Sequence, residues 1–216
     1  RNRYAVIMSG NSDFRHPEAI HFADSILSEK NYDTYIFDDT KDRRYNVTGL
    51  TTKKNLESFF DTLKTDKDGL FLLYVTGHGN RDTTQNDTTS TINVAKGDPL
   101  KPSTLEKYLN KVDASDKVLL FTQCHSGEFG KELGRGDNIA ISTSSENKSS
   151  YGTFFGNEFF GSFDDKKADI NNDNKISAFE ASSYALLNDP YTPVLLDDRR
   201  EVLFSEKRGI PHFIAH

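Results

Sequence analysis

The sequence predicts an α/β layer sandwich with a largely parallel central sheet. Short apolar runs alternate with amphipathic segments through the first two-thirds of the chain, which is the element order of βαβ units. The central runs contain few polar residues, as expected for strands that helices cover on both faces. The composition supplies a core for such a fold, because the 216 residues include 16 Phe and 9 Tyr.

Strands are expected wherever a short apolar run ends at polar residues or glycine. Five segments meet this description, and the expected strands are residues 4–8, 34–37, 70–75, 118–121 and 139–141.

Helices are expected between these strands. Apolar residues repeat at helical spacing between residues 17 and 27 and again between residues 56 and 63. Ser103 and Glu106 have the spacing of a capping box, which predicts that a helix begins there. The stretch 80–91 is rich in Thr, Asn and Asp, which indicates an exposed loop or a hairpin tip.

Composition also narrows the possible functions. The chain has 27 Lys and Arg against 33 Asp and Glu, so its net charge of −6 argues against a general nucleic-acid binder. No apolar run approaches the ~18 residues of a membrane span. Cys124 is the single cysteine, which excludes an internal disulfide framework and a cysteine-rich zinc site. We expect one domain over residues 1–216.

Two expected strands end in residues that can carry nucleophilic chemistry. His78 follows the run 70–75, and Cys124 follows the run 118–121. Adjacent parallel strands would place both residues at one edge of the sheet, where the imidazole can take the thiol proton. The backbone N–H groups of Gly79 and Cys124 are then candidate donors to an oxyanion. A lone cysteine in a strand is usually a packing residue, so the hypothesis rests on the pair.

The residues around this pair resemble the motifs of caspase-like cysteine peptidases, above all the legumain family. The similarity extends over residues 4–163, and its two main motifs are Val75-Thr-Gly-His78-Gly79 and Phe121-Thr-Gln-Cys124-His-Ser-Gly127. It implies a caspase-like three-layer α/β/α sandwich and a cysteine endopeptidase that works through an acyl-enzyme. Two rivals stay open: a transpeptidase or ligase that uses the same acyl-enzyme, and a catalytically silent interaction module.

Further segments extend the resemblance to the candidate substrate site. Asp13-Phe14-Arg15-His16 is similar to the legumain Asn-Tyr-Arg-His segment, and residues 149–152 and 155–160 are similar to two others. The resemblance implies that Asp13 orients His78 and that Arg15 contacts the P1 side chain. The neighbouring substrate-binding residues that it implies are Gln123, Ser149, Ser150 and Asn157.

Departures from the family pattern bear on specificity. Thr122 and Asn157 stand where the family has acidic residues, so Arg15 lacks those two partners. An arginine without them favours a carboxylate or an amide oxygen and repels Lys and Arg. The sequence therefore predicts cleavage of a peptide or protein substrate after Asp or Asn. It leaves the oligomeric state open.

The segment 169–180 resembles an EF-hand calcium loop. Oxygen-bearing side chains fall at loop positions 1, 3, 5, 9 and 12. The ligand at position 7 is a backbone carbonyl, and asparagine occupies position 6, where glycine is usual. The expected Ca²⁺ ligands are Asp169, Asn171, Asp173, Lys175, Ser177 and Glu180. The alternative is a plain acidic loop. A lone calcium loop of this kind suits a place where calcium is plentiful, so we expect an extracytoplasmic or secreted location.

Overall fold

The computed structural model describes residues 1–10, 15–39, 46–84, 87–136, 138–150 and 153–189, together with the backbone of 203–205 and 213–215. Its centre is a six-stranded sheet in the order β2-β1-β3-β6-β7-β9. The first five of these strands are mutually parallel, and β9 joins the β7 edge in the antiparallel direction. The strands are β1 Arg3–Ser9, β2 Asp33–Phe37, β3 Leu70–Thr76, β6 Asp116–Phe121, β7 Asn138–Ser142 and β9 Leu203–Ser205.

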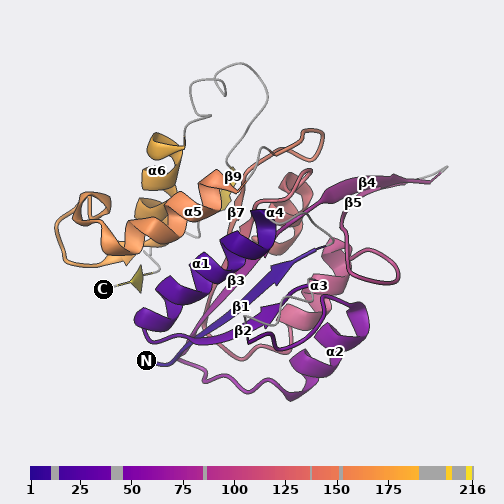
Figure 1. Cartoon of the computed structure of the whole chain (residues 1–216), viewed down its shortest axis with the longest axis horizontal. Coiled ribbons are helices and arrows are strands. Elements are labelled where there is room, and N and C mark those ends of the chain that lie inside the picture. Colours follow the sequence, from indigo (N-terminus) through magenta and orange to yellow (C-terminus); the bar gives the residue numbers. More distant parts are fainter. Residues whose placement is uncertain are drawn as a thin grey trace.

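Helices cover both faces of the sheet, which makes the three-layer sandwich visible in Figure 1. One face packs against α1 (Arg15–Glu29), α5 (Phe154–Gly161) and α6 (Ala178–Asn188). The other face packs against α2 (Lys53–Thr62), α3 (Pro102–Leu109) and α4 (Gly127–Leu133). Each face has its own apolar core, and β3 is buried along its whole length between the two. The fold class predicted from the sequence is therefore confirmed.

The expected helices and strands are present, with one local error. The segment 80–91 forms a hairpin of β4 (Gly79–Thr83) and β5 (Thr88–Ile92). The capping box predicted at Ser103 and Glu106 is wrong, because the N-cap of α3 is Lys101, two residues before Ser103, and Pro102 lies in the first turn. Proline is favoured there because its ring fixes a helical φ and no N–H is needed.

The segment after α5 is irregular. Two 3₁₀ turns, Ser162–Asp164 and Lys166–Ala168, lead to the short strand β8 (Ile176–Ser177), which pairs with β10 (Phe213–Ala215) in the antiparallel direction. Within the described ranges, no helix has both the length and the apolar character needed to cross a bilayer.

The strand register decides where the polar residues gather. Ser9 at the end of β1 pairs with Thr76 at the end of β3, while Val75 pairs with Phe121 at the end of β6. Phe121 in turn pairs with Ser142 at the end of β7. The carboxyl ends of four strands therefore lie at one edge, which is where ligand sites form in sheets of this kind.

Candidate active site

His78 and Cys124 follow neighbouring strands at this edge. The two segments touch through their backbones, since a Cβ built on Gly79 would lie 2.2 Å from the Cys124 carbonyl oxygen. The same Cβ would lie 2.9 Å from Cγ of Gln123. Only glycine permits this approach, so the residue after His78 keeps the end of β3 against the end of β6.

The thiol of Cys124 is half-buried and faces the segment that follows β7. The Ser150 N–H donates to Sγ at 3.3 Å, and Sγ lies 3.7 Å from the Ser150 carbonyl oxygen. Between Cys124 and His78, both of which are described, the structure has no hydrogen bond. Catalytic hydrogen bonds are often long before substrate arrives, so this geometry is compatible with either an active or a silent site.

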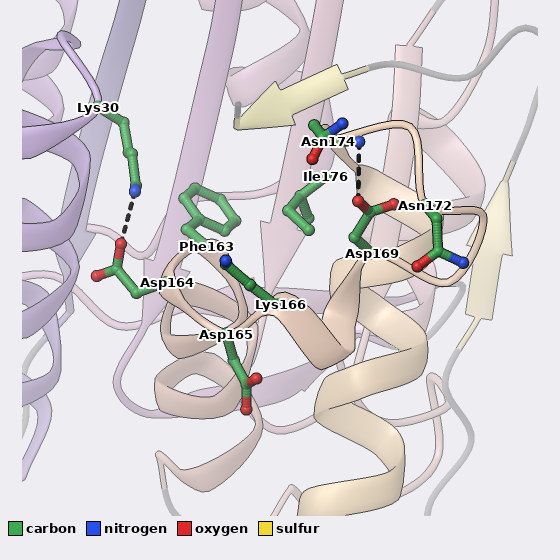
Figure 2. A pocket seen from close by; sticks show the side chains of 9 residues that line it. All are labelled: Lys30, Phe163, Asp164, Asp165, Lys166, Asp169, Asn172, Asn174 and Ile176. Carbon is green, nitrogen blue, oxygen red and sulfur yellow. Dashed lines mark hydrogen bonds and ion pairs between the residues drawn. The ribbon is translucent and has the colours of Figure 1, made fainter.

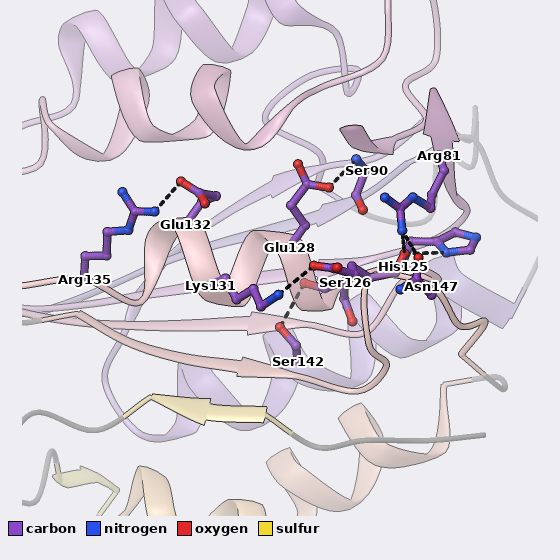
Figure 3. Close-up of polar contacts among 11 residues, drawn as sticks. Arg81, Ser90, His125, Ser126, Glu128, Lys131, Glu132, Arg135, Ser142 and Asn147 are labelled. Carbon is purple, nitrogen blue, oxygen red and sulfur yellow. Dashed lines mark hydrogen bonds and ion pairs between the residues drawn. The ribbon is translucent and has the colours of Figure 1, made fainter. Parts of the chain in front are cut away.

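Several polar contacts hold the segment 146–150 beside Cys124, and Figure 3 shows some of them. His125 has a left-handed backbone, with φ of 58°, and its N–H donates to the Lys148 carbonyl at 2.9 Å. Its Nδ1 donates to the Glu146 carbonyl at 3.0 Å, and Arg81 donates to that same oxygen at 3.0 Å. The Lys131 ammonium holds the pKa of the Glu146 carboxyl below its usual range. The backbone and side chain of His125 therefore help to hold the segment 146–148 beside Cys124.

A second histidine, His16, lies buried at this edge of the sheet, and the sequence analysis assigned it no role of its own. His16, the second residue of α1, is 5% exposed, and its Nδ1 accepts the Gly77 N–H at 3.1 Å. The same Nδ1 lies 2.8 Å from the Thr76 hydroxyl oxygen. Its ring lies edge-on to that of His78, with centroids 5.7 Å apart and an interplanar angle of 69°. The sequence offers one indication of a role for His16, which is its position beside Arg15 in the motif. Its burial could not be predicted from the sequence.

Arg15 and Asn157 line one cavity of about 340 Å³ between α1 and α5. Glu18, one helical turn after Arg15, lines the same cavity. Glu18 is thus a carboxylate of this cavity that the sequence analysis did not identify. The aromatic rings of Phe22 and Phe154 complete much of the wall.

The other predicted substrate residues lie elsewhere at the edge. Ser150 is at the Cys124 thiol, and its hydroxyl is 2.9 Å from the hydroxyl of Thr143. Ser149 does not line the cavity. Gln123 is fully buried, and neither end of its amide has a hydrogen-bond partner in the described structure. Asp13 lies outside the described residues.

Two buried neutral polar groups lie near the start of α5, one on the helix and one on β3. The Asn157 Oδ1 is buried without a hydrogen-bond partner among the described residues. Beside it, the backbone of Gly156 leaves room for the Tyr74 hydroxyl, which would lie 2.4 Å from a Cβ at that position. Burial raises the pKa of Tyr74 to about 12, so this hydroxyl stays uncharged near neutral pH.

The loop 169–180, where the sequence predicts calcium ligands, is held by local hydrogen bonds. Asp169 accepts the N–H groups of Asp173 and Asn174 at 3.0 and 2.8 Å, and Asn171 accepts that of Asp173 at 2.9 Å. Asn174 has φ of 63°, the left-handed conformation that glycine usually supplies at this position. Figure 2 shows Asp169 turned toward Asn174 beside a cavity of about 420 Å³.

The carboxylate at the end of this loop, that of Glu180, accepts hydrogen bonds from the protein's own N–H and O–H groups. Glu180 is buried and forms a capping box with Ser177 at the start of α6. Its Oε1 also accepts the N–H groups of Ile170 and Asn171, at 3.0 and 3.3 Å. In the part of the chain that the structure describes, no three carboxylate, histidine or cysteine side chains are grouped to hold a metal. The acidic side chains described in this loop therefore bond to the loop's own N–H groups and are not gathered around one point.

Comparison with known proteins identifies a peptidase family. A family model described as the peptidase C13 family matches residues 32–173. No curated protein sequence matches the chain.

Two solved structures resemble the fold. One is a Geobacter sulfurreducens protein solved as a structural genomics target, with a TM-score of 0.63, 13% identity, and coverage of 96% of this chain and 95% of that one. The other is a secreted C11 cysteine protease from Bacteroides thetaiotaomicron in complex with an irreversible peptide inhibitor. Its TM-score is 0.51 at 11% identity, covering 87% of this chain and 58% of that one. At such identities these likenesses show the fold alone.

Proposed function

Because the chain belongs to the peptidase C13 family, and is therefore a cysteine peptidase, we propose that Cys124 and His78 form its catalytic dyad. One observation carries the proposal. The strands β3 and β6 are parallel neighbours, and the residues that follow them touch where Gly79 meets the Cys124 backbone. This contact supports a shared site for the two side chains, because it keeps the turn after β3 beside the turn after β6.

The proposed chemistry is acyl transfer. Cys124 attacks the peptide carbonyl as its proton passes to His78, which then protonates the leaving amine. The Ser150 N–H, aimed at the sulfur, favours negative charge there. The N–H groups of Gly79 and Cys124 are our candidate oxyanion donors, and Asp13 is our candidate to orient His78. Water completes hydrolysis, whereas an amine in its place would give a transpeptidase or ligase.

For substrate choice, we propose cleavage after Asn or Asp, read by the cavity that holds Arg15 and Asn157. The Arg15 guanidinium carries several N–H donors that suit an oxygen of the P1 side chain, and the buried Asn157 Oδ1 can accept an N–H, so the pair suits a side-chain amide. Glu18 in the same cavity opposes a second carboxylate. The proposal therefore ranks Asn above Asp at P1, and both above Lys and Arg.

A panel of peptides that differ only at P1 tests this function. We expect the highest kcat/KM for Asn, then Asp, with Lys and Arg cleaved least. Glu18→Gln should raise the Asp-to-Asn ratio about fivefold by removing a like charge at an exposed site. Glu29→Gln, at the exposed end of the same helix, is the matched control and should leave the ratio unchanged. Best cleavage after Lys or Arg would overturn the specificity, and no cleavage of any peptide would favour the silent module.

We also propose that the loop 169–180 binds Ca²⁺ through Asp169, Asn171, Asp173, Ser177 and Glu180 and the Lys175 carbonyl. The spacing of oxygen donors and the left-handed Asn174 support it. The ion would neutralise carboxylates and hold the loop against α6; it supplies nothing to the acyl-transfer chemistry.

Thermal unfolding in Ca²⁺ and in chelator tests this site. Saturating Ca²⁺, at about 100 times Kd, should stabilise the fold by about 2.7 kcal/mol and raise Tm by at least about 5 °C. Asp173→Asn should reduce that shift while leaving Tm in chelator nearly unchanged, because Asp173 is exposed. Glu106→Gln, at an exposed position on α3, is the control. A shift that Mg²⁺ reproduces fully, or that Asp173→Asn retains, would show that the loop is a plain acidic turn.

A further inference from the structure

His16 connects α1 to the turn that carries His78. Its Nδ1 accepts the Gly77 N–H, and because a backbone N–H only donates, Nδ1 carries no proton in this arrangement. The neutral ring therefore has its proton on Nε2. The Thr76 hydroxyl lies 2.8 Å from the same Nδ1. The side chain of His16 thus holds the last residue of β3 and the residue immediately before His78.

The turn itself has little freedom. Gly77 has φ of 107°, and a Cβ on it would lie 2.8 Å from the Gly10 backbone nitrogen. The Gly10 N–H in turn donates to the Thr76 carbonyl at 3.1 Å. The direction in which His78 leaves the sheet is therefore set by Gly10, Gly77 and His16 together.

The ring of His78 has few other restraints. It is exposed, and no hydrogen bond from the described residues reaches its imidazole. The edge-on contact with the buried His16 ring, at 5.7 Å between centroids, limits how far it can turn. A general base needs such restraint, because a misplacement of about 1 Å can cost about 100-fold in rate.

We propose that His16 is a positioning residue for His78, acting through the Gly77 N–H and through ring contact. The proposal rests on His78 being the base of the proposed function. His16 is buried and does not line the cavity that holds Arg15 and Asn157, so we assign it no direct contact with the P1 side chain. Its loss should lower kcat and leave KM little changed, because binding of the peptide does not require the imidazole to be aligned.

Two substitutions separate the two contacts. His16→Asn keeps an acceptor where Nδ1 stood and removes the ring, whereas His16→Phe keeps a ring and removes the acceptor. We expect each to lower kcat about 10- to 100-fold at a temperature where the variant is fully folded. Ser25→Ala, at an exposed position on α1, should leave kcat unchanged.

A double-mutant cycle distinguishes positioning from a general structural role. In a His78→Ala background, His16→Asn should have no further effect on the residual rate, because there is no imidazole left to position. A further loss of similar size in that background, or unchanged kcat in both single variants, would overturn the proposal. If His78→Ala itself retains full activity, the proposed dyad fails, and this outcome is separate from the His16 result.

Discussion

The Cys124→Ala variant should lose peptide hydrolysis, with kcat reduced by at least about 10⁴-fold. Cys124 is the only thiol in the sequence, so no second cysteine can substitute for it. A peptidyl acyloxymethyl ketone should label the parent protein with a stoichiometry of one and the variant not at all. Labelling at any other residue would be visible as a residual signal in the variant.

His78→Ala should be nearly as damaging, and the two substitutions should not add. If the thiol works only through the imidazole, the double variant loses about as much as either single one. His21→Gln, elsewhere on α1, is the control for loss of a histidine. Additive effects, or labelling that His78→Ala leaves at the parent rate, would mean that Cys124 reacts without this base.

The layers of the fold could be predicted because the strands are unusually apolar. The residues 70–75 and 118–121 have almost no polar member, which marks strands covered on both faces, and both are fully buried. Their parallel pairing requires a long crossover, which here contains α3. The edge strand β9 was not predicted, because its residues lie among prolines and short apolar pieces with no clear period.

Only the part of the site that lies at the ends of strands could be predicted from the sequence. The sequence places His78 and Cys124 at the ends of neighbouring strands, but contacts across the edge depend on backbone approach. That Gly79 touches the Cys124 carbonyl, or that His16 is buried against Gly77, follows from how the loops fold back. Glu18 was missed for a related reason, because helical geometry places it in the cavity only once α1 is docked against α5.

The capping boxes illustrate how a local pattern can mislead. Ser103 with Glu106 and Ser177 with Glu180 have the same spacing, yet only the second pair forms the reciprocal bonds. The difference lies in the preceding residue. Pro102 begins α3 before Ser103, whereas extended backbone at Ser177 leaves its hydroxyl free to accept the Glu180 N–H at 3.1 Å.

Gly79→Ala should be strongly damaging at the candidate site. The new Cβ would overlap the Cys124 carbonyl oxygen at 2.2 Å, and backbone cannot move aside as a flexible side chain can. The hairpin strand β4 must then shift away from the end of β6. We expect a loss of about 1–3 kcal/mol in the free energy of unfolding, together with a fall in kcat of about 100-fold.

Gly161 provides the matched control, since a Cβ there would meet no atom within 4 Å and its backbone is not left-handed. Gly161→Ala should leave kcat unchanged and stabilise the fold slightly, by up to about 1 kcal/mol, through reduced freedom of the unfolded chain. Denaturant unfolding and peptide hydrolysis measured on the same samples separate the two effects. If Gly79→Ala loses stability but keeps kcat, the contact is structural and the alignment of His78 with Cys124 does not depend on it. If kcat falls while Gly161→Ala is silent, the close approach of the two turns is itself part of the catalytic geometry.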